Sequence, residues 1–120
     1  MDASVVLAWL QDEPGSDQAE PLLMEGLISA ANWSEVLQKS RQHGVDAELA
    51  ARLLASFGLN VIGVTKDDGE RAAALWRKGG GLSLADRLCL ALGLRLSLDV
   101  ATADRRWDGL PEAPEILLIR

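Results

Sequence analysis

SLADRLCLALGLRLSLDVAT, residues 83–102, decides the fold class. Residues 84–97 are apolar almost all round a helix, and LDVAT directly after them has the continuous apolar pattern of a short strand. A helix without a polar face is buried, and such a strand is typical of a parallel sheet covered on both faces. One residue conflicts with this pattern. Asp86 lies at the start of the apolar helix, where a carboxylate without a partner is costly.

The same alternation extends outward through the rest of the chain. Helices are expected at residues 4–10, 16–26, 33–42, 46–57 and 67–78, a short helical turn at 105–110, and strands at 27–30, 60–64, 98–102 and 115–119. Alternating strands and helices predict a three-layer α/β fold with a central parallel sheet. The 120 residues contain no repeat or long linker, so we expect a single domain over residues 1–120. In such folds ligands bind beyond the carboxyl ends of the strands.

The composition favours a cytoplasmic protein. The single cysteine, Cys89, excludes an internal disulfide and a cysteine-rich zinc site, and its apolar surroundings predict a buried thiol. No apolar run approaches the roughly 20 residues that span a bilayer, and the acidic start differs from the basic start of a signal peptide. We therefore expect no contact with a membrane.

Charge is distributed unevenly along the chain, whose net charge is −6. Residues 1–70 carry 4 basic and 12 acidic side chains, which gives −8, whereas residues 71–120 carry 8 basic and 6 acidic, which gives +2. The overall sign argues against general coating of nucleic acid, but a basic surface in the second half would suit phosphate. An ordinary solvated charge pattern explains the same distribution.

Four acidic residues lie at or near the starts of predicted helices, and two of those helices directly follow strands. They are Asp2, Glu35, Asp86 and Asp104. Because helix starts favour acidic side chains, each one alone is explained by capping, and both Asn32-x-x-Glu35 and Ser83-x-x-Asp86 fit the capping-box pattern. Capping does not explain the apolar neighbours of Glu35 and Asp86.

A shared cation is the alternative to four separate caps. Clustered carboxylates repel one another unless a cation neutralises them, and oxygen ligands alone suit Mg²⁺ or Mn²⁺. Such a site activates water and stabilises the charge that develops on a phosphodiester. The lone His43, in the turn RQHGVD, is poorly placed for zinc and is expected at the surface.

Four segments in order then carry a family resemblance. DASVVLAWLQDEPG, SAANWSEVL, GLSLADRLCLALGLRL and VATADRRW together resemble PIN-domain ribonucleases of the VapC toxin type, over nearly the whole chain. The resemblance implies a metal-dependent endoribonuclease that leaves 5′-phosphate and 3′-hydroxyl ends. It also implies a homodimer and a cognate VapB-like antitoxin whose C-terminal segment covers the site.

The resemblance also implies roles for individual residues. Asp2, Glu35, Asp86 and Asp104 match the acidic quartet that holds Mg²⁺ or Mn²⁺ in the family. Ser4 and Thr102 match small hydroxyl residues that support the pocket, although hydrogen bonds at a helix start and a strand end explain them equally well. Asp108 is a candidate outer ligand or an exposed turn residue.

Basic and aromatic residues close to these acids are candidates for contact with RNA. Arg87, Arg105 and Arg106 adjoin proposed ligands, so they are candidates for holding RNA phosphate; surface ion pairs are the alternative. Trp107 either stacks on a base or packs under the last turn. Trp9 and Trp76 are expected as core or interface anchors.

One departure from the family concerns the segment before the first acid. Members normally have a short apolar strand there, in the centre of the sheet, whereas here only Met1 precedes Asp2. The position of Asp2 is therefore the least secure of the four. Two other functions fit the same fold: a non-catalytic interaction module, and a phosphate-accepting signalling domain. The latter requires a lysine after a late strand, and the late strands here have none.

Overall fold

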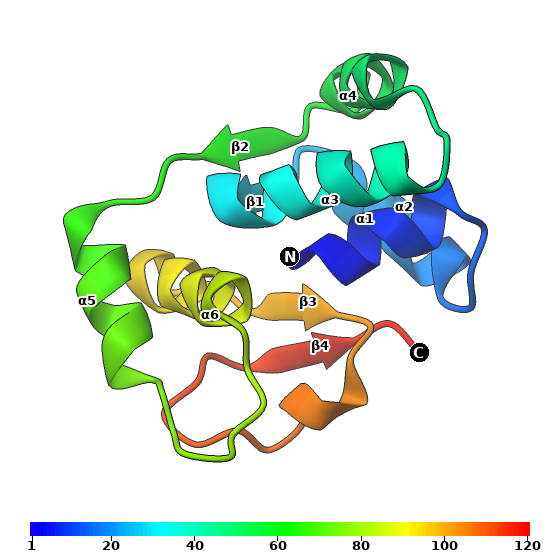
Figure 1. The fold of residues 1–120 in the computed structure, drawn as a ribbon. Coiled ribbons are helices and arrows are strands. Elements are labelled where there is room, and N and C mark those ends of the chain that lie inside the picture. The colour runs from blue at the N-terminus through cyan, green and yellow to red at the C-terminus, as the bar shows by residue number, and fades with distance from the viewer.

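The computed structural model describes all 120 residues and has the predicted alternation of helices and strands (Figure 1). The elements in chain order are α1 (Ala3–Leu10), α2 (Ser16–Leu23), β1 (Leu27–Ser29), α3 (Ala30–Gln42), α4 (Ala47–Ser56), β2 (Asn60–Ile62), α5 (Lys66–Ala74), α6 (Leu84–Leu96), β3 (Val100–Thr102), the 3₁₀ turn η1 (Arg105–Trp107) and β4 (Ile116–Leu118). All strands pair in parallel, so the α/β class is confirmed. No helix is both long and apolar enough to cross a bilayer.

The strands form two pairs, β1 with β2 and β3 with β4. Only the first two residues join β1 to β3. The amino group of Met1 donates to the Leu27 carbonyl at 3.0 Å, and the amide of Asp2 donates to the Ala101 carbonyl at 3.0 Å. Figure 1 shows the N-terminus between the pairs. A mainly apolar cavity of about 460 Å³ lies between the pairs.

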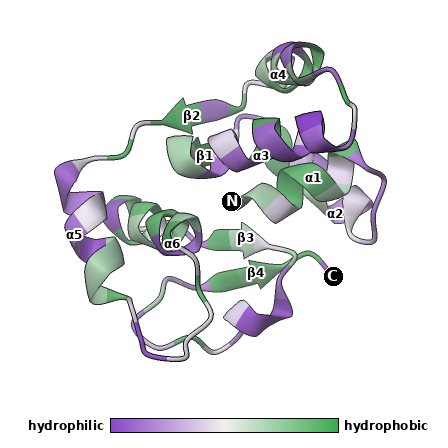
Figure 2. Ribbon diagram, viewed as in Figure 1, coloured by the Kyte–Doolittle hydropathy of each residue, from purple (hydrophilic) through white to green (hydrophobic).

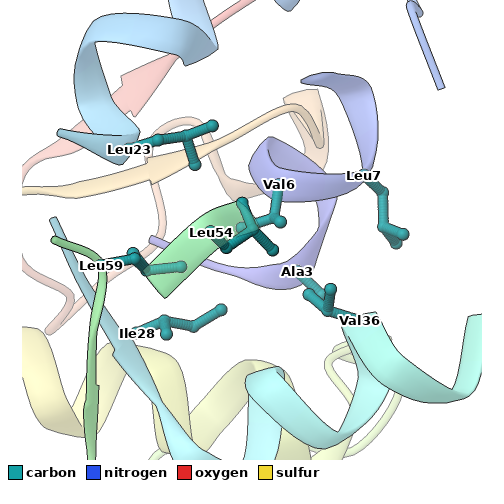
Figure 3. Close-up of a cluster of buried hydrophobic side chains, with 8 residues drawn as sticks. All are labelled: Ala3, Val6, Leu7, Leu23, Ile28, Val36, Leu54 and Leu59. Atoms are coloured by element: carbon teal, nitrogen blue, oxygen red, sulfur yellow. The ribbon is translucent and has the colours of Figure 1, made fainter. Parts of the chain in front are cut away.

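The core lies where α1 packs against its neighbours. A cluster of eight buried side chains unites α1, α2, β1, α3 and α4 (Figure 3); its members are Ala3, Val6, Leu7, Leu23, Ile28, Val36, Leu54 and Leu59. A second cluster joins the other side of α1 to β3 through Val5, Ala8 and Ala101. Figure 2 shows α1 as a mainly hydrophobic helix, in agreement with its central position. Burial on two sides holds the start of α1 firmly against β3.

The start of α3 differs from the prediction. Asn32 was expected to cap this helix, but the cap is Ser29, whose hydroxyl accepts from the amide of Ala31 at 3.3 Å. Strand β1 passes directly into the helix because the two alanines after Ser29 are good helix formers. Asn32 therefore lies inside the first turn and is completely buried. The capping-box reading of Asn32 and Glu35 is wrong for the same reason.

Candidate metal centre

Asp2 is the most deeply buried of the four candidate acids, with 6% of its surface exposed. It precedes α1 as the N-cap residue, yet its side chain makes no capping hydrogen bond. Its carboxylate instead accepts a hydrogen bond from the Ser4 hydroxyl at 2.6 Å and another from the Thr102 hydroxyl at 3.0 Å. Burial raises the pKa of Asp2, and these two hydrogen bonds oppose that rise. A carboxylate in this setting gains from a nearby cation.

Thr102 connects Asp2 to Asp104. It is fully buried at the end of β3, and its hydroxyl also accepts from the backbone amide of Asp104 at 3.0 Å. The Ser4 hydroxyl accepts in turn from the amide of Ala103 at 2.8 Å. Both hydroxyls therefore tie the start of α1 to the segment that follows β3, although nearly the whole chain separates them in sequence.

Asp104 follows β3 and caps η1 by accepting from the amide of Arg106 at 3.0 Å. The Arg106 guanidinium also grips this carboxylate, with its shortest contact at 2.6 Å. Hydrogen bonding from Arg106 lowers the pKa of Asp104, which keeps the carboxylate ionised. Arg106 therefore occupies the oxygens that a metal ion would need.

Asp86 forms the capping box predicted for the buried helix. Its amide donates to the Ser83 hydroxyl at 3.1 Å, and its carboxylate accepts from the Ser83 amide at 3.0 Å. The side chain is half-buried, and its second carboxylate oxygen accepts no hydrogen bond. Capping therefore accounts for only part of its ligand capacity.

Glu35 lies one turn into α3 and is linked to the start of α6 by a buried amide. The side chain of Asn32 donates to the Glu35 carboxylate at 3.4 Å and to the carbonyl of Ala85 at 3.3 Å. Its own carbonyl oxygen, Oδ1, is buried without a partner. Asn32 thus holds Glu35 next to the residue that precedes Asp86. Nothing local in the sequence indicates this bridge, because the two ends of the bond are 53 positions apart.

The charges of three of these acids act on the buried thiol of Cys89. Burial is the main cause that raises the pKa of the Cys89 thiol to about 12, and the charges of Asp2, Asp86 and Glu35 contribute to the rise. The charge of Asp86 also contributes to the raised pKa of Asp2. The hydrogen bonds agree with this for Glu35, since Asn32 links it to Ala85 at the start of α6, next to Asp86.

The donors have the chemistry for a hard divalent ion but are not closed around one. All four supply carboxylate oxygens, which suit Mg²⁺ and Mn²⁺. In this conformation no three of them are close enough together to form a metal-binding group. Each carboxylate is held by a neighbour from its own or an adjacent element, so rotation of the partly exposed side chains is needed to assemble a site.

Comparison with known proteins gives the family. A family model described as the PIN domain matches residues 1–113. The chain belongs to the PIN-domain family. A solved structure described as a toxin-antitoxin complex from Klebsiella pneumoniae is similar to the chain, with 24% identity and a TM-score of 0.76, and the match covers 99% of this chain and 95% of that one. This likeness shows the fold. No curated protein matches the chain in sequence.

PIN domains are generally nucleases, and they typically use divalent metal ions. Membership of the family supports a hydrolase that acts on nucleic acid, and it agrees with the oxygen-rich donor set around the start of α6. The resemblance to the PIN family found in the sequence is confirmed.

The three arginines proposed to hold phosphate are all engaged in this PIN domain. Arg87 donates to the carbonyl of Ala72 at 2.8 Å and ties α6 to α5. Arg105 donates to the carbonyl of Arg120 at 3.2 Å, and Arg106 holds Asp104. Arg87 therefore has a structural role here, whereas Arg105 and Arg106 remain exposed beside the acids.

The remaining candidates lie as follows. Asp108 is exposed at the end of η1, and no hydrogen bond or ion pair of its carboxylate is formed. Trp107 is 1% exposed and packs in a core cluster with Leu90, which leaves no face for stacking on a base. Trp76 is 58% exposed, whereas Trp9 packs edge-on against Phe57.

Proposed function

We propose that this PIN domain is a Mg²⁺- or Mn²⁺-dependent endoribonuclease and the toxin of a bacterial toxin–antitoxin pair. The observation that carries the proposal is the buried carboxylate of Asp2. Its pKa is raised by burial, and two hydroxyls and the charge of Asp86 act on it from separate elements. Burying an ionisable group in this way costs stability, and a bound cation offsets that cost.

The four acids would share the binding of the ion, and their roles differ with their burial. Asp2, Glu35, Asp86 and Asp104 would hold the ion, with Ser4 and Thr102 orienting Asp2 and Asp108 available at the outer rim. A bound divalent ion supplies a water activated for attack and neutralises charge on the phosphate. The buried Asp2 fixes the inner wall of the site, and the half-buried acids adjust around substrate.

The proposed partners follow from the family and from the solved relative. That relative is described as a toxin-antitoxin complex, which supports a VapB-like antitoxin as the partner of this chain. We further propose a homodimer in the cytoplasm with RNA as substrate. A non-catalytic interaction module is the alternative, since the acids are not assembled in this conformation.

Cleavage of RNA by the purified chain tests the proposal. We expect cleavage in Mg²⁺ or Mn²⁺ that stops on chelation and that is abolished by Asp86→Asn and by Asp104→Asn. Asparagine keeps the oxygen that accepts the capping amide in both places, so folding persists. Asp12→Asn is the matched control, because Asp12 is exposed and its φ of 50° suits asparagine equally well.

Two results would remove the metal mechanism. One is equal cleavage with and without chelator, and the other is full activity in both site variants. Sequencing the RNA ends after brief expression, beside the Asp86→Asn control, identifies the target and the position of cleavage. Absence of any cleavage together with intact partner binding would favour the interaction module.

A further inference from the structure

A polar cleft of about 350 Å³ lies between α1 and α3 and borders the candidate metal centre. Only one of its eight lining residues is hydrophobic. Ser4 belongs to both places, since its side chain lines the cleft and its hydroxyl donates to Asp2 at 2.6 Å. A ligand that occupies the cleft is therefore adjacent to the carboxylates.

The cleft follows one stripe on each helix. On α3 the stripe consists of Lys39, Gln42 and the following His43, and on α1 it runs from Ser4 through Leu7 to Gln11, with the three- and four-residue spacing that places side chains on one helix face. Glu35 does not line the cleft but lies one turn before Lys39 on α3, about 6 Å along the axis at 1.5 Å per residue. The cleft thus adjoins the acids at Ser4, and the rest of its lining consists mainly of amide and charged side chains.

Two cationic side chains, Lys39 and Arg120, line the cleft in a protein whose net charge is −6. Lys39 is exposed and forms no ion pair or side-chain hydrogen bond. The Arg120 guanidinium donates to the Glu13 carboxylate at 3.2 Å and to the carbonyl of Pro14 at 3.0 Å. Arg120 is therefore balanced by Glu13. The ammonium of Lys39 is the cation that is free to bind a ligand.

We propose that this α1–α3 cleft binds the backbone of single-stranded RNA beside the phosphate that reacts, with Lys39 as its main phosphate contact. The inference rests on the proposed nuclease function. RNA carries phosphates at regular intervals, so one phosphate meets a cation at Lys39 while its neighbour lies against a metal held by the acids. An acidic protein segment lacks that regular spacing of charges.

The composition of the cleft also defines what it recognises. The amides of Gln11 and Gln42 donate and accept, which suits ribose hydroxyls as well as phosphate oxygens. No Phe, Tyr or Trp lines the cleft, and the imidazole of His43 is its only aromatic ring, so it offers little platform for stacking on bases. It therefore supplies affinity for the RNA backbone, and sequence selectivity arises elsewhere.

Binding of a fluorescein-labelled oligouridylate, measured by anisotropy at several salt concentrations in Mg²⁺, tests the cleft. Every protein carries Asp86→Asn so that RNA stays intact. We expect Lys39→Gln to weaken binding several-fold and to reduce the slope of log affinity against log salt by about 0.7, the value for one phosphate contact on a single strand. Adding Arg120→Gln should reduce the slope by about 0.7 again.

Arg41→Gln is the matched control. Arg41 is exposed on the same helix, carries the same charge and does not line the cleft. Equal effects of Lys39→Gln and Arg41→Gln on affinity and slope would overturn the inference, as would loss of a protein partner without loss of RNA binding. If metal-dependent cleavage fails but Lys39 still controls RNA binding, the cleft stands and the nuclease proposal falls. If cleavage occurs and Lys39 has no specific effect, the reverse holds.

Discussion

The hydroxyl of Thr102 allows the sharpest test of how the candidate centre is held together. Thr102 is 0% exposed at the end of β3. Its hydroxyl donates to the Asp2 carboxylate at 3.0 Å and accepts from the Asp104 amide at 3.0 Å. Valine has nearly the same shape without the hydroxyl, so Thr102→Val removes both bonds and creates little empty space.

The expected cost of Thr102→Val follows from those two bonds. Loss of a hydrogen bond to an ionised carboxylate costs about 1.5–3 kcal/mol, and a partly buried amide left without an acceptor costs at most about 1–3 kcal/mol. We therefore expect the free energy of unfolding to fall by about 3–5 kcal/mol, measured by urea denaturation at neutral pH. Thr102→Ser keeps the hydroxyl and loses one buried methyl group, so it should cost only about 1 kcal/mol.

The pH dependence gives the same prediction a second measurement. Burial raises the pKa of Asp2 above its value in the unfolded chain. The free energy of unfolding is therefore highest with respect to this group below pH 3.8, and it declines as the pH rises through the raised pKa. The hydrogen bond from Thr102 opposes this rise. Removing it raises the pKa of Asp2 further, so the gap in stability between the wild type and Thr102→Val should widen from acid to neutral pH.

Two results would refute this reasoning. The first is a Thr102→Val protein that is no less stable than Thr102→Ser. The second is a stability difference that stays constant with pH, which would mean that the hydroxyl does not act on the charge of Asp2. Metal-dependent cleavage should also need more Mg²⁺ in Thr102→Val than in Thr102→Ser, because Asp2 and Asp104 are no longer tied together.

Three further predictions concern other charged or buried groups. Arg106→Gln should lower the Mg²⁺ concentration for half-maximal cleavage, because Arg106 competes with the ion for Asp104. Arg95→Leu should lower the urea midpoint markedly near neutral pH and much less in acid, as the pH falls below about 3.8. Burial opposes ionisation of Asp68, but its bonds to Arg95 and to Thr65 outweigh that effect and lower its pKa. The stabilisation that the Asp68–Arg95 ion pair provides is therefore lost as the pH falls through that lowered pKa. Cys89 should resist alkylation in the native protein, because burial raises the pKa of its thiol to about 12.

Each of these predictions has a control within the chain. Arg105→Gln removes an exposed neighbouring charge without freeing Asp104, and equal effects of the two substitutions would contradict competition by Arg106. Lys66→Gln breaks an exposed pair of 3.7 Å and should leave stability unchanged. An Arg95→Leu protein as stable as Lys66→Gln would contradict the role of its pair. Rapid alkylation of Cys89 without denaturant would show that the thiol is accessible.

The sequence predicted the order of the elements because local signals mark their ends. The pair Ser83 and Asp86 announced the start of α6, and the capping box that it predicted is present. The start of α3 was misplaced because Asn32 is also a good capping residue, and nothing local shows that Ser29 comes first. Its true role, a bridge to Ala85, depends on a partner brought near by the fold.

The contacts of the charged side chains were the feature least predictable from sequence. Arg87, Arg105 and Arg106 were proposed for RNA because they adjoin candidate ligands, but adjacency in sequence does not show where a long side chain ends. The fold directs Arg87 to a carbonyl on α5 and Arg106 back to Asp104. Lys39, far from the later acids in sequence, gave no such signal, because its place beside Ser4 arises only when α1 packs on α3.

The arrangement of the acids without metal has a physical reason. Four ionised carboxylates in one pocket repel one another, so each gains more from a nearby donor than from approaching the others: Asp2 from two hydroxyls, Asp86 from an amide, Asp104 from Arg106. These donors hold the acids around the start of α6 but apart. A divalent ion changes the balance, because attraction to two positive charges outweighs the repulsion among the ligands. On the proposed function, assembly of the centre and binding of the metal are therefore one event, and the metal should stabilise the wild type more than Asp86→Asn.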